Sequence, residues 1–235
     1  MPTNAGFFSP ASVDIVHAFV RRGIPREDEV LDHSYAYVRN IAYNLQYLEF
    51  LNHTLEKLEL HVTVRTLSQK TFVITGMSLV EAMLWYVLKK AGQQRREYWE
   101  EVQDFRNPTF KQDGIEYQLT NKISRKLPKA VDAEMSLDAM IKRVESKKLL
   151  GLDLQVYKDL NYLRKLRNRV HIHAVQHDKD TDWWNFNNKE VKLMKGVLFS
   201  VLSSQLFSPL PEHSSLIGYL TVAETTEELA AELPF

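Results

Sequence analysis

Residues 70–90 read KTFVITGMSLVEAMLWYVLKK, and apolar side chains lie on almost every face of the helix that this stretch would form. A helix that is apolar all round is normally buried in the middle of a protein. We therefore predict a central core helix over residues 70–90, with the other helices packed around it. Glu81 lies within this stretch, and a buried carboxylate needs a partner. It is expected either to orient an arginine of a functional site or to bond to a neighbouring helix.

Helical patterns also precede this core helix. An N-terminal helix is predicted to begin with Ser9 as N-cap and Pro10 in its first turn, and to end at Gly23. The next pattern repeats at spacings of three and four residues, which indicates a buried seam or a dimer interface. Its members are Val38, Ile41, Leu45, Leu48, Asn52 and Leu55. The segment 60–66, LHVTVRT, alternates like a strand, but helical flanks favour a junction between two helices.

Residues 105–135 are the least helical part of the chain. Asn107-Pro108 and Asp113-Gly114 are turn signals, so we predict one short β-hairpin near residues 108–120. Helix resumes after Ser136, a predicted N-cap, and Asn187 with Glu190 resembles a capping box for the last long helix. The predicted fold is an all-α helical bundle with long N-terminal helices and at most that one hairpin. We divide it into an N-terminal helical extension with a candidate dimer seam (1–69), a helical core (70–207) and an acidic tail (208–235).

Composition narrows the range of functions. The chain of 235 residues is 44% hydrophobic, which can fill a core, and it has no cysteine, which excludes disulfides, thiolate metal sites and cysteine nucleophiles. The longest apolar run, residues 82–88, is far shorter than the ~20 residues that span a bilayer, and the N-terminus does not resemble a signal peptide. We therefore expect a soluble, cytoplasmic protein without a membrane partner.

Charge is balanced overall but distributed unevenly. The chain has 30 basic and 30 acidic side chains, yet residues 119–170 hold 13 basic and six acidic ones. The residues after Lys195 contain five acidic side chains and no basic one. A local basic excess favours either a polyanionic partner or an ordinary solvated helix face.

The candidate chemistry lies in LRKLRNRVHIH, residues 163–173. On a helix, Arg164, Arg167 and His171 fall within an arc of ~60° beside the apolar stripe. Arginine offers forked donors for a phosphate, and histidine exchanges protons near neutral pH. Together they suffice to cleave RNA without a metal, because the imidazole handles protons while the guanidinium stabilises charge on the phosphate oxygens. No cluster of carboxylates accompanies these residues in the sequence. The structural alternative is that they form salt bridges or helix caps.

The run from Arg167 to His173, RNRVHIH, resembles the signature of HEPN domains (higher eukaryotes and prokaryotes nucleotide-binding). That signature is an arginine, often followed by a polar residue such as asparagine, and a histidine after four to six further residues. Arg167 with His173 fits this spacing, and so does Arg164 with His171. The core helix before the motif and the apolar helix after it extend the resemblance over residues 70–207. The resemblance implies a helical bundle, often a homodimer, with two motifs facing each other across a cleft.

Many HEPN proteins are metal-independent ribonucleases that act as toxins or anti-phage effectors, so the resemblance implies an endoribonuclease with no cofactor. An antitoxin or another defence protein is an expected partner. We expect Arg167 to contact the scissile phosphate, Asn168 to orient it, and Arg164 and Arg169 to bind RNA. Family spacing favours His173 as the proton-transferring residue, whereas ideal helix geometry favours His171; both are candidates.

The same region allows three other interpretations. His171, His173, His177, Asp178 and Asp180 crowd together as in a metal site, but they match the metallo-β-lactamase pattern only at its first two histidines, and we predict no metal. Trp183, Trp184 and Phe186 could stack on bases, but we expect them to fix a loop to the bundle. The alternative function is a non-catalytic helical module that binds a partner protein or a nucleotide.

Overall fold

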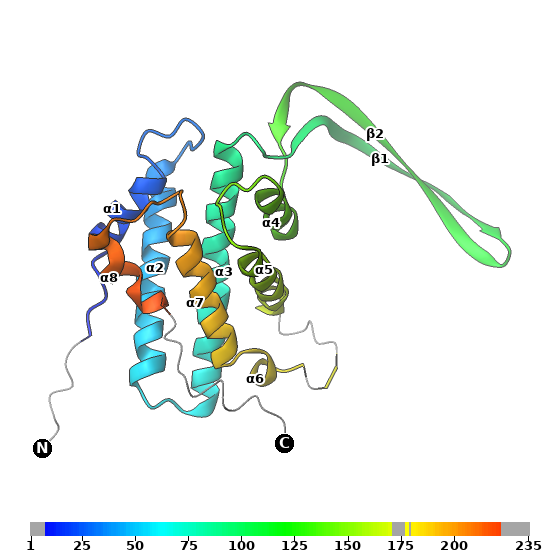
Figure 1. Ribbon diagram of the computed structural model, residues 1–235. Coiled ribbons are helices and arrows are strands. Elements are labelled where there is room, and N and C mark those ends of the chain that lie inside the picture. Colours follow the sequence, from blue (N-terminus) through cyan, green and yellow to red (C-terminus); the bar gives the residue numbers. More distant parts are fainter. Residues whose placement is uncertain (1–7, 171–176, 179, 222–235) are drawn as a thin grey trace, which may run out of the picture.

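The computed structural model describes residues 8–170, 177–178 and 180–221, and it is mainly helical with one two-stranded antiparallel sheet (Figure 1). Its helices and strands, in chain order, are α1 (Val13–Gly23), α2 (Ser34–Lys57), α3 (Val62–Lys90), β1 (Arg96–Gln112), β2 (Ile115–Asp132), α4 (Leu137–Ser146), α5 (Leu154–Arg167), α6 (Asp182–Asn185), α7 (Asn188–Leu202) and α8 (Ser214–Ile217).

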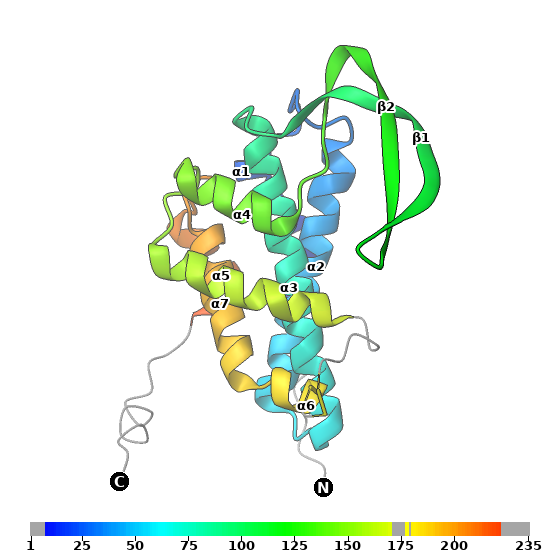
Figure 2. The ribbon, with the colours of Figure 1, turned by 90° about the vertical axis from the view of Figure 1, so that its right-hand side faces the viewer.

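The predicted central helix is the axis of the bundle. α3 packs against α2, α7, α4 and α5, and Figure 2 shows α4 and α5 in front of it with α2 behind. It begins at Val62, so the 60–66 segment spans the junction between α2 and α3, as predicted. Within the part of the chain that the structure describes, only α3 is long and apolar enough to cross a membrane, and most of its apolar stretch is buried inside the bundle. Core burial therefore accounts for its hydropathy.

The seam predicted in the N-terminal part belongs to the core of the chain itself. All six of its residues are at most 6% exposed and line the inner face of α2. The five apolar ones join one hydrophobic cluster with residues of α1, α3, α4, α5 and α7. The predicted division at residue 69 falls inside α3, so residues on both sides of it share this core.

Helix starts were predicted correctly at two sites and wrongly at one. Ser136 caps α4 by accepting from the Ala139 N–H, and Asn187 forms the predicted capping box with Glu190 at the start of α7. The first helix, however, is capped by Ser12 and not by Ser9. Hydrogen bonds to α2 account for the difference: the Ala11 N–H donates to Glu49 and its carbonyl accepts from Gln46 (2.9 Å each), which holds this segment outside the helix.

The β-hairpin is much longer than predicted. β1 and β2 pair from Arg96↔Asp132 to Gln112↔Ile115, around the predicted Asp113-Gly114 turn, where both residues adopt positive φ. The expectation of an all-α fold with a short hairpin near 108–120 is therefore corrected to a mainly helical fold with a two-stranded arm. The pairing has three register irregularities. The irregularities in β1 disturb the alternation of apolar and polar residues, and for this reason the first half of β1 was not predicted as a strand.

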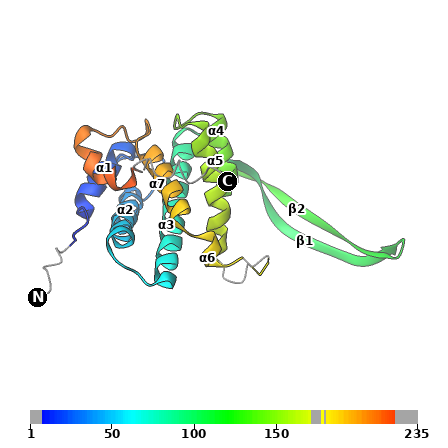
Figure 3. The same ribbon diagram turned by 60° about the horizontal axis from the view of Figure 1, so that its bottom comes forward.

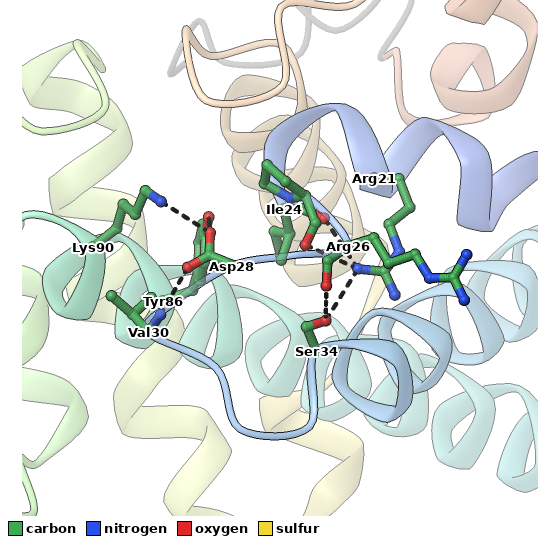
Figure 4. A network of polar contacts seen from close by, with 9 residues as sticks. Arg21, Ile24, Arg26, Asp28, Val30, Ser34, Tyr86 and Lys90 are labelled. Atoms are coloured by element: carbon green, nitrogen blue, oxygen red, sulfur yellow. Dashed lines mark hydrogen bonds and ion pairs between the residues drawn. The ribbon is translucent and has the colours of Figure 1, made fainter.

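A polar network fixes the loop between α1 and α2 to the end of α3 (Figure 4). The Asp28 side chain is fully buried and accepts hydrogen bonds from the Tyr86 hydroxyl (2.6 Å), the Val30 N–H (3.0 Å) and Lys90 Nζ (3.1 Å). Burial acts to raise the pKa of Asp28, but these hydrogen bonds outweigh it and hold the pKa below its ordinary value.

Candidate active site at the end of α5

Arg167 is the last residue of α5, where a 3-10 turn over Asn168–Val170 follows. Its Nη2 donates to Oε2 of Glu81 on the core helix α3 at 2.7 Å. The two side chains are 37% and 27% exposed, so the pair lies at the rim of the bundle and not in its interior. Of the two partners considered for Glu81, the structure shows the arginine of the motif. The carboxylate occupies one edge of the guanidinium, which orients the remaining donors.

The other two arginines of the motif are also paired, each with a carboxylate from a different element. Arg164 contacts Asp138 at the start of α4 (2.9 Å), and Arg169 contacts Asp180 in the segment before α6. Asp138 also accepts from Lys142 at 2.7 Å, and this bond, with the charge of Arg164, lowers the pKa of Asp138. The sequence shows no cluster of carboxylates beside the motif, and in the structure the acids come singly from distant positions. Tertiary packing supplies one to each arginine and offsets much of the expected positive charge.

Of the remaining predicted site residues, the structure describes Asn168 but neither histidine. Asn168 is exposed, directly beside Arg167 in the 3-10 turn. His171 and His173 lie outside the described residues. The structure therefore brings Arg164, Arg167, Asn168 and Arg169 together at one end of α5, and the predicted histidines follow in the chain.

The segment after the motif is held against the bundle by several contacts. Lys70 of α3 bonds to both carboxylate oxygens of Asp182 at 2.9 Å, and the ring of Phe186 is 1% exposed. Phe186 thus fixes the loop to the bundle, as predicted. The same prediction is wrong for Trp183 and Trp184, which are 53% and 64% exposed. Both lie on α6, a single helical turn whose one side packs on α3, so the two indoles project into solvent.

Tyr162 links the motif helix to the helix after it. Its hydroxyl donates to Glu190 at 2.8 Å, and Glu190 is itself the buried acid of the capping box of α7. Partial burial and this hydrogen bond raise the pKa of Tyr162 to about 12, so the tyrosine stays neutral near physiological pH. The contact fixes the middle of α5 relative to α7.

The arrangement suits recognition of a phosphate more than it suits a metal. Arg167 is oriented and accessible, and two solvent-exposed indoles offer flat surfaces of the kind on which unpaired bases stack. No group of three acidic or histidine side chains with metal-binding geometry occurs among the residues that the structure describes. In the group considered for a metal, Asp180 contacts Arg169 and Asn185.

Sequence reasoning missed Asp138 and Asp180 as partners of the motif. Asp138 lies 26 residues before Arg164, and no spacing rule connects two such positions. Asp180 was considered only as a candidate metal ligand, and Asp138 only as part of the helix that begins after Ser136.

No protein-family model matches the chain, and no curated protein or solved structure is similar enough to indicate a relationship.

Proposed function

We propose that this protein is a metal-independent endoribonuclease of the HEPN type, acting in the cytoplasm as a toxin or an anti-phage effector. The observation that carries the proposal is the Arg167–Glu81 pair. An arginine at the end of the penultimate core helix is oriented by an acid from the central helix, yet its side chain is 37% exposed. This exposure leaves the other guanidinium donors of Arg167 accessible to a phosphate.

In this proposal, Arg167 binds the scissile phosphate and stabilises the charge that develops on its oxygens. His171 or His173 transfers protons to or from the 2′-hydroxyl and the leaving 5′-oxygen. Asn168 orients the phosphate, and Arg164 and Arg169 add positive potential that Asp138 and Asp180 moderate. Trp183 and Trp184 stack on bases next to the cleaved bond. A homodimer brings two such sites together, and an antitoxin or defence protein controls them.

The test is cleavage of single-stranded RNA by the purified protein in excess EDTA. Cleavage that survives chelation is the expected result, and Arg167→Ala is expected to reduce the rate by about 10²-fold or more. Replacing the catalytic histidine should cost a similar factor, whereas Lys165→Ala, an exposed position on the same helix, is the matched control. Full activity of Arg167→Ala, or of both His171→Ala and His173→Ala, would refute the proposal.

Glu81→Gln separates orientation from chemistry. Glutamine keeps an acceptor for Arg167 but removes the charge, so a smaller loss of rate than for Arg167→Ala is expected, with the protein still folded. Because Arg167 is still present and loses only its charged partner, the affinity for RNA should change less than the maximal rate of cleavage.

A second candidate function is a non-catalytic module that binds a partner protein or a nucleotide. The pairing of all three motif arginines with carboxylates favours it, because paired arginines offer a polyanion less net charge. Under this alternative, the protein cleaves no RNA with or without EDTA and is not toxic on expression.

A further inference from the structure

The hairpin formed by β1 and β2, residues 96–132 and here called the arm, is a surface that the proposed function does not use. It projects from the bundle beyond the ends of α3 and α4 (Figure 1, Figure 3). None of the residues in its two strands is buried. A two-stranded ribbon is at best marginally stable in water without a surface to pack on.

The distal half of the arm has one apolar and one polar face. In β2 the odd-numbered residues from 115 to 123 are apolar except Asn121, and the even-numbered ones are polar. Phe110 lies opposite Tyr117, with the rings stacked at 5.7 Å, and Phe105 lies opposite Asn121, so both phenylalanines join the apolar face. This apolar face comprises Phe105, Phe110, Ile115, Tyr117, Leu119 and Ile123, each between 41% and 57% exposed.

A solvent-exposed apolar face of this extent marks an interaction site. At 150–250 Å² for a whole aromatic side chain, its three aromatic residues alone expose ~300 Å², so the whole face reaches the size of the largest apolar patch on a typical monomer, which is often functional. The charges of the arm argue against a nucleic acid as its partner. They comprise seven acidic and seven basic side chains, and Glu100 and Glu101 pair across the strands with Arg125 and Lys122 at 2.6 Å. The partner surface is therefore apolar and belongs to a protein.

The same chain carries a matching apolar surface on α2. Tyr43, Tyr47 and Phe50 lie on the side of α2 opposite its buried seam and are 43–48% exposed. Tyr35 and Leu58, 61% and 52% exposed, lie beyond the two ends of this set. We call these five residues the aromatic stripe. Along the helix axis the set extends about 35 Å from Tyr35 to Leu58 at 1.5 Å per residue, with Tyr35 about 60–120° around the axis from the three central aromatic residues. The apolar face of the arm from Ile115 to Ile123 spans about 26 Å.

Within one molecule the arm leads away from α2, because it extends from the opposite side of the bundle (Figure 1, Figure 3). We propose that the arm binds a second copy of this chain, with the apolar face of each arm packed on the aromatic stripe of the other copy. A twofold dimer makes this contact twice, because the arm of each copy packs on α2 of the other.

The sizes agree with such a dimer. The arm is about 55 Å long at ~3.3 Å per residue, and the longest helix of the bundle, α3, is about 44 Å, so an arm reaches across a partner. A contact about 26 Å by 10 Å, made twice and counted on both surfaces, buries about 1,000 Å², which is the lower bound for a specific interface. An interface at this lower bound is typical of a weak or transient dimer. The inference names the contact of the homodimer proposed above and does not depend on RNA cleavage.

The test is light scattering after size exclusion at about 1 to 100 µM, the range in which such an interface dissociates. The full-length chain is expected to shift from monomer to dimer over this range. Phe110→Ser combined with Tyr117→Ser removes the centre of the apolar face and is expected to leave only monomer. The matched control is Thr109→Ser with Gln118→Ser, the neighbouring cross-strand pair on the polar face, which should keep the dimer.

Tyr47→Ser combined with Phe50→Ser tests the receiving surface and is expected to abolish the dimer as well. Circular dichroism verifies that each variant is folded. A wild-type protein that is monomeric at the highest concentration, or an apolar-face variant that still dimerises, overturns the proposal. A dimer that survives in the stripe variant overturns the assignment of α2. EDTA-resistant cleavage by a monomeric wild type refutes the arm contact and the homodimer but not the ribonuclease, whereas an inactive dimer refutes the ribonuclease alone.

Discussion

Replacing Asp28 with alanine should destabilise the protein more than any single surface change, because three donors depend on this carboxylate. The Tyr86 hydroxyl is left buried without its acceptor, which costs about 1–3 kcal/mol, and the lost Val30 N–H bond costs about 1 kcal/mol. Lys90 is 54% exposed and is rehydrated, so its loss adds little. The free energy of unfolding should therefore fall by about 3 kcal/mol for Asp28→Ala.

Urea unfolding followed by circular dichroism at pH 7 measures this loss. Tyr86→Phe removes one bond and leaves the carboxylate with its other two donors, so it should cost only about 1–2 kcal/mol. Because the pKa of Asp28 is lowered in the folded state, the stabilisation by its charge is present above the unfolded pKa of about 4 and is lost as the pH falls below it. The advantage of the wild type over Asp28→Asn should shrink accordingly. A loss below about 1 kcal/mol for Asp28→Ala, or a pH-independent difference, would refute this account.

Two further pairs of variants test the packing. Gly196→Ala, in open space on α7, should raise the free energy of unfolding by about 0.5–1 kcal/mol. Gly76→Ala on α3 should lower it by about 1–3 kcal/mol, because the added Cβ would lie 2.7 Å from Cγ of the buried Met194. Equal effects of the two substitutions in urea unfolding would contradict the packing of α3 on α7. Phe186→Ala should lower the free energy of unfolding by about 3–5 kcal/mol, whereas Trp184→Ala should change it by no more than about 0.5 kcal/mol. A large loss of stability for Trp184→Ala would mean that this indole is packed and not available to RNA.

Much of the helical framework could be predicted from local patterns. The apolar stretch at 70–90 predicted the buried core helix, and Ser136 and Asn187 predicted two helix starts. These signals are local because a cap satisfies backbone donors within one turn and an apolar stripe repeats every three or four residues. The prediction failed at Ser9, where hydrogen bonds from Ala11 to α2 outweighed the local signal.

The site was predicted only in part. Arg164 and Arg167 lie in the last turn of α5 but contact different helices, and Glu81 meets Arg167 as one of two expected partners. The pairing of Arg164 and Arg169 with carboxylates could not be derived from the sequence, since each pair joins elements whose contact depends on how the helices pack.

The sequence alone determined the core helix over 70–90, the starts of α4 and α7, the buried face of α2, and the turn at Asp113-Gly114. Those properties follow from side-chain periodicity and backbone conformation, which neighbouring residues settle. Only the tertiary structure decided how far the arm extends, which acids neutralise the motif arginines, and that Trp183 and Trp184 are exposed whereas Phe186 is buried. Each of these depends on groups far apart in the chain, and the free energy of such contacts exists only once the helices have packed around α3.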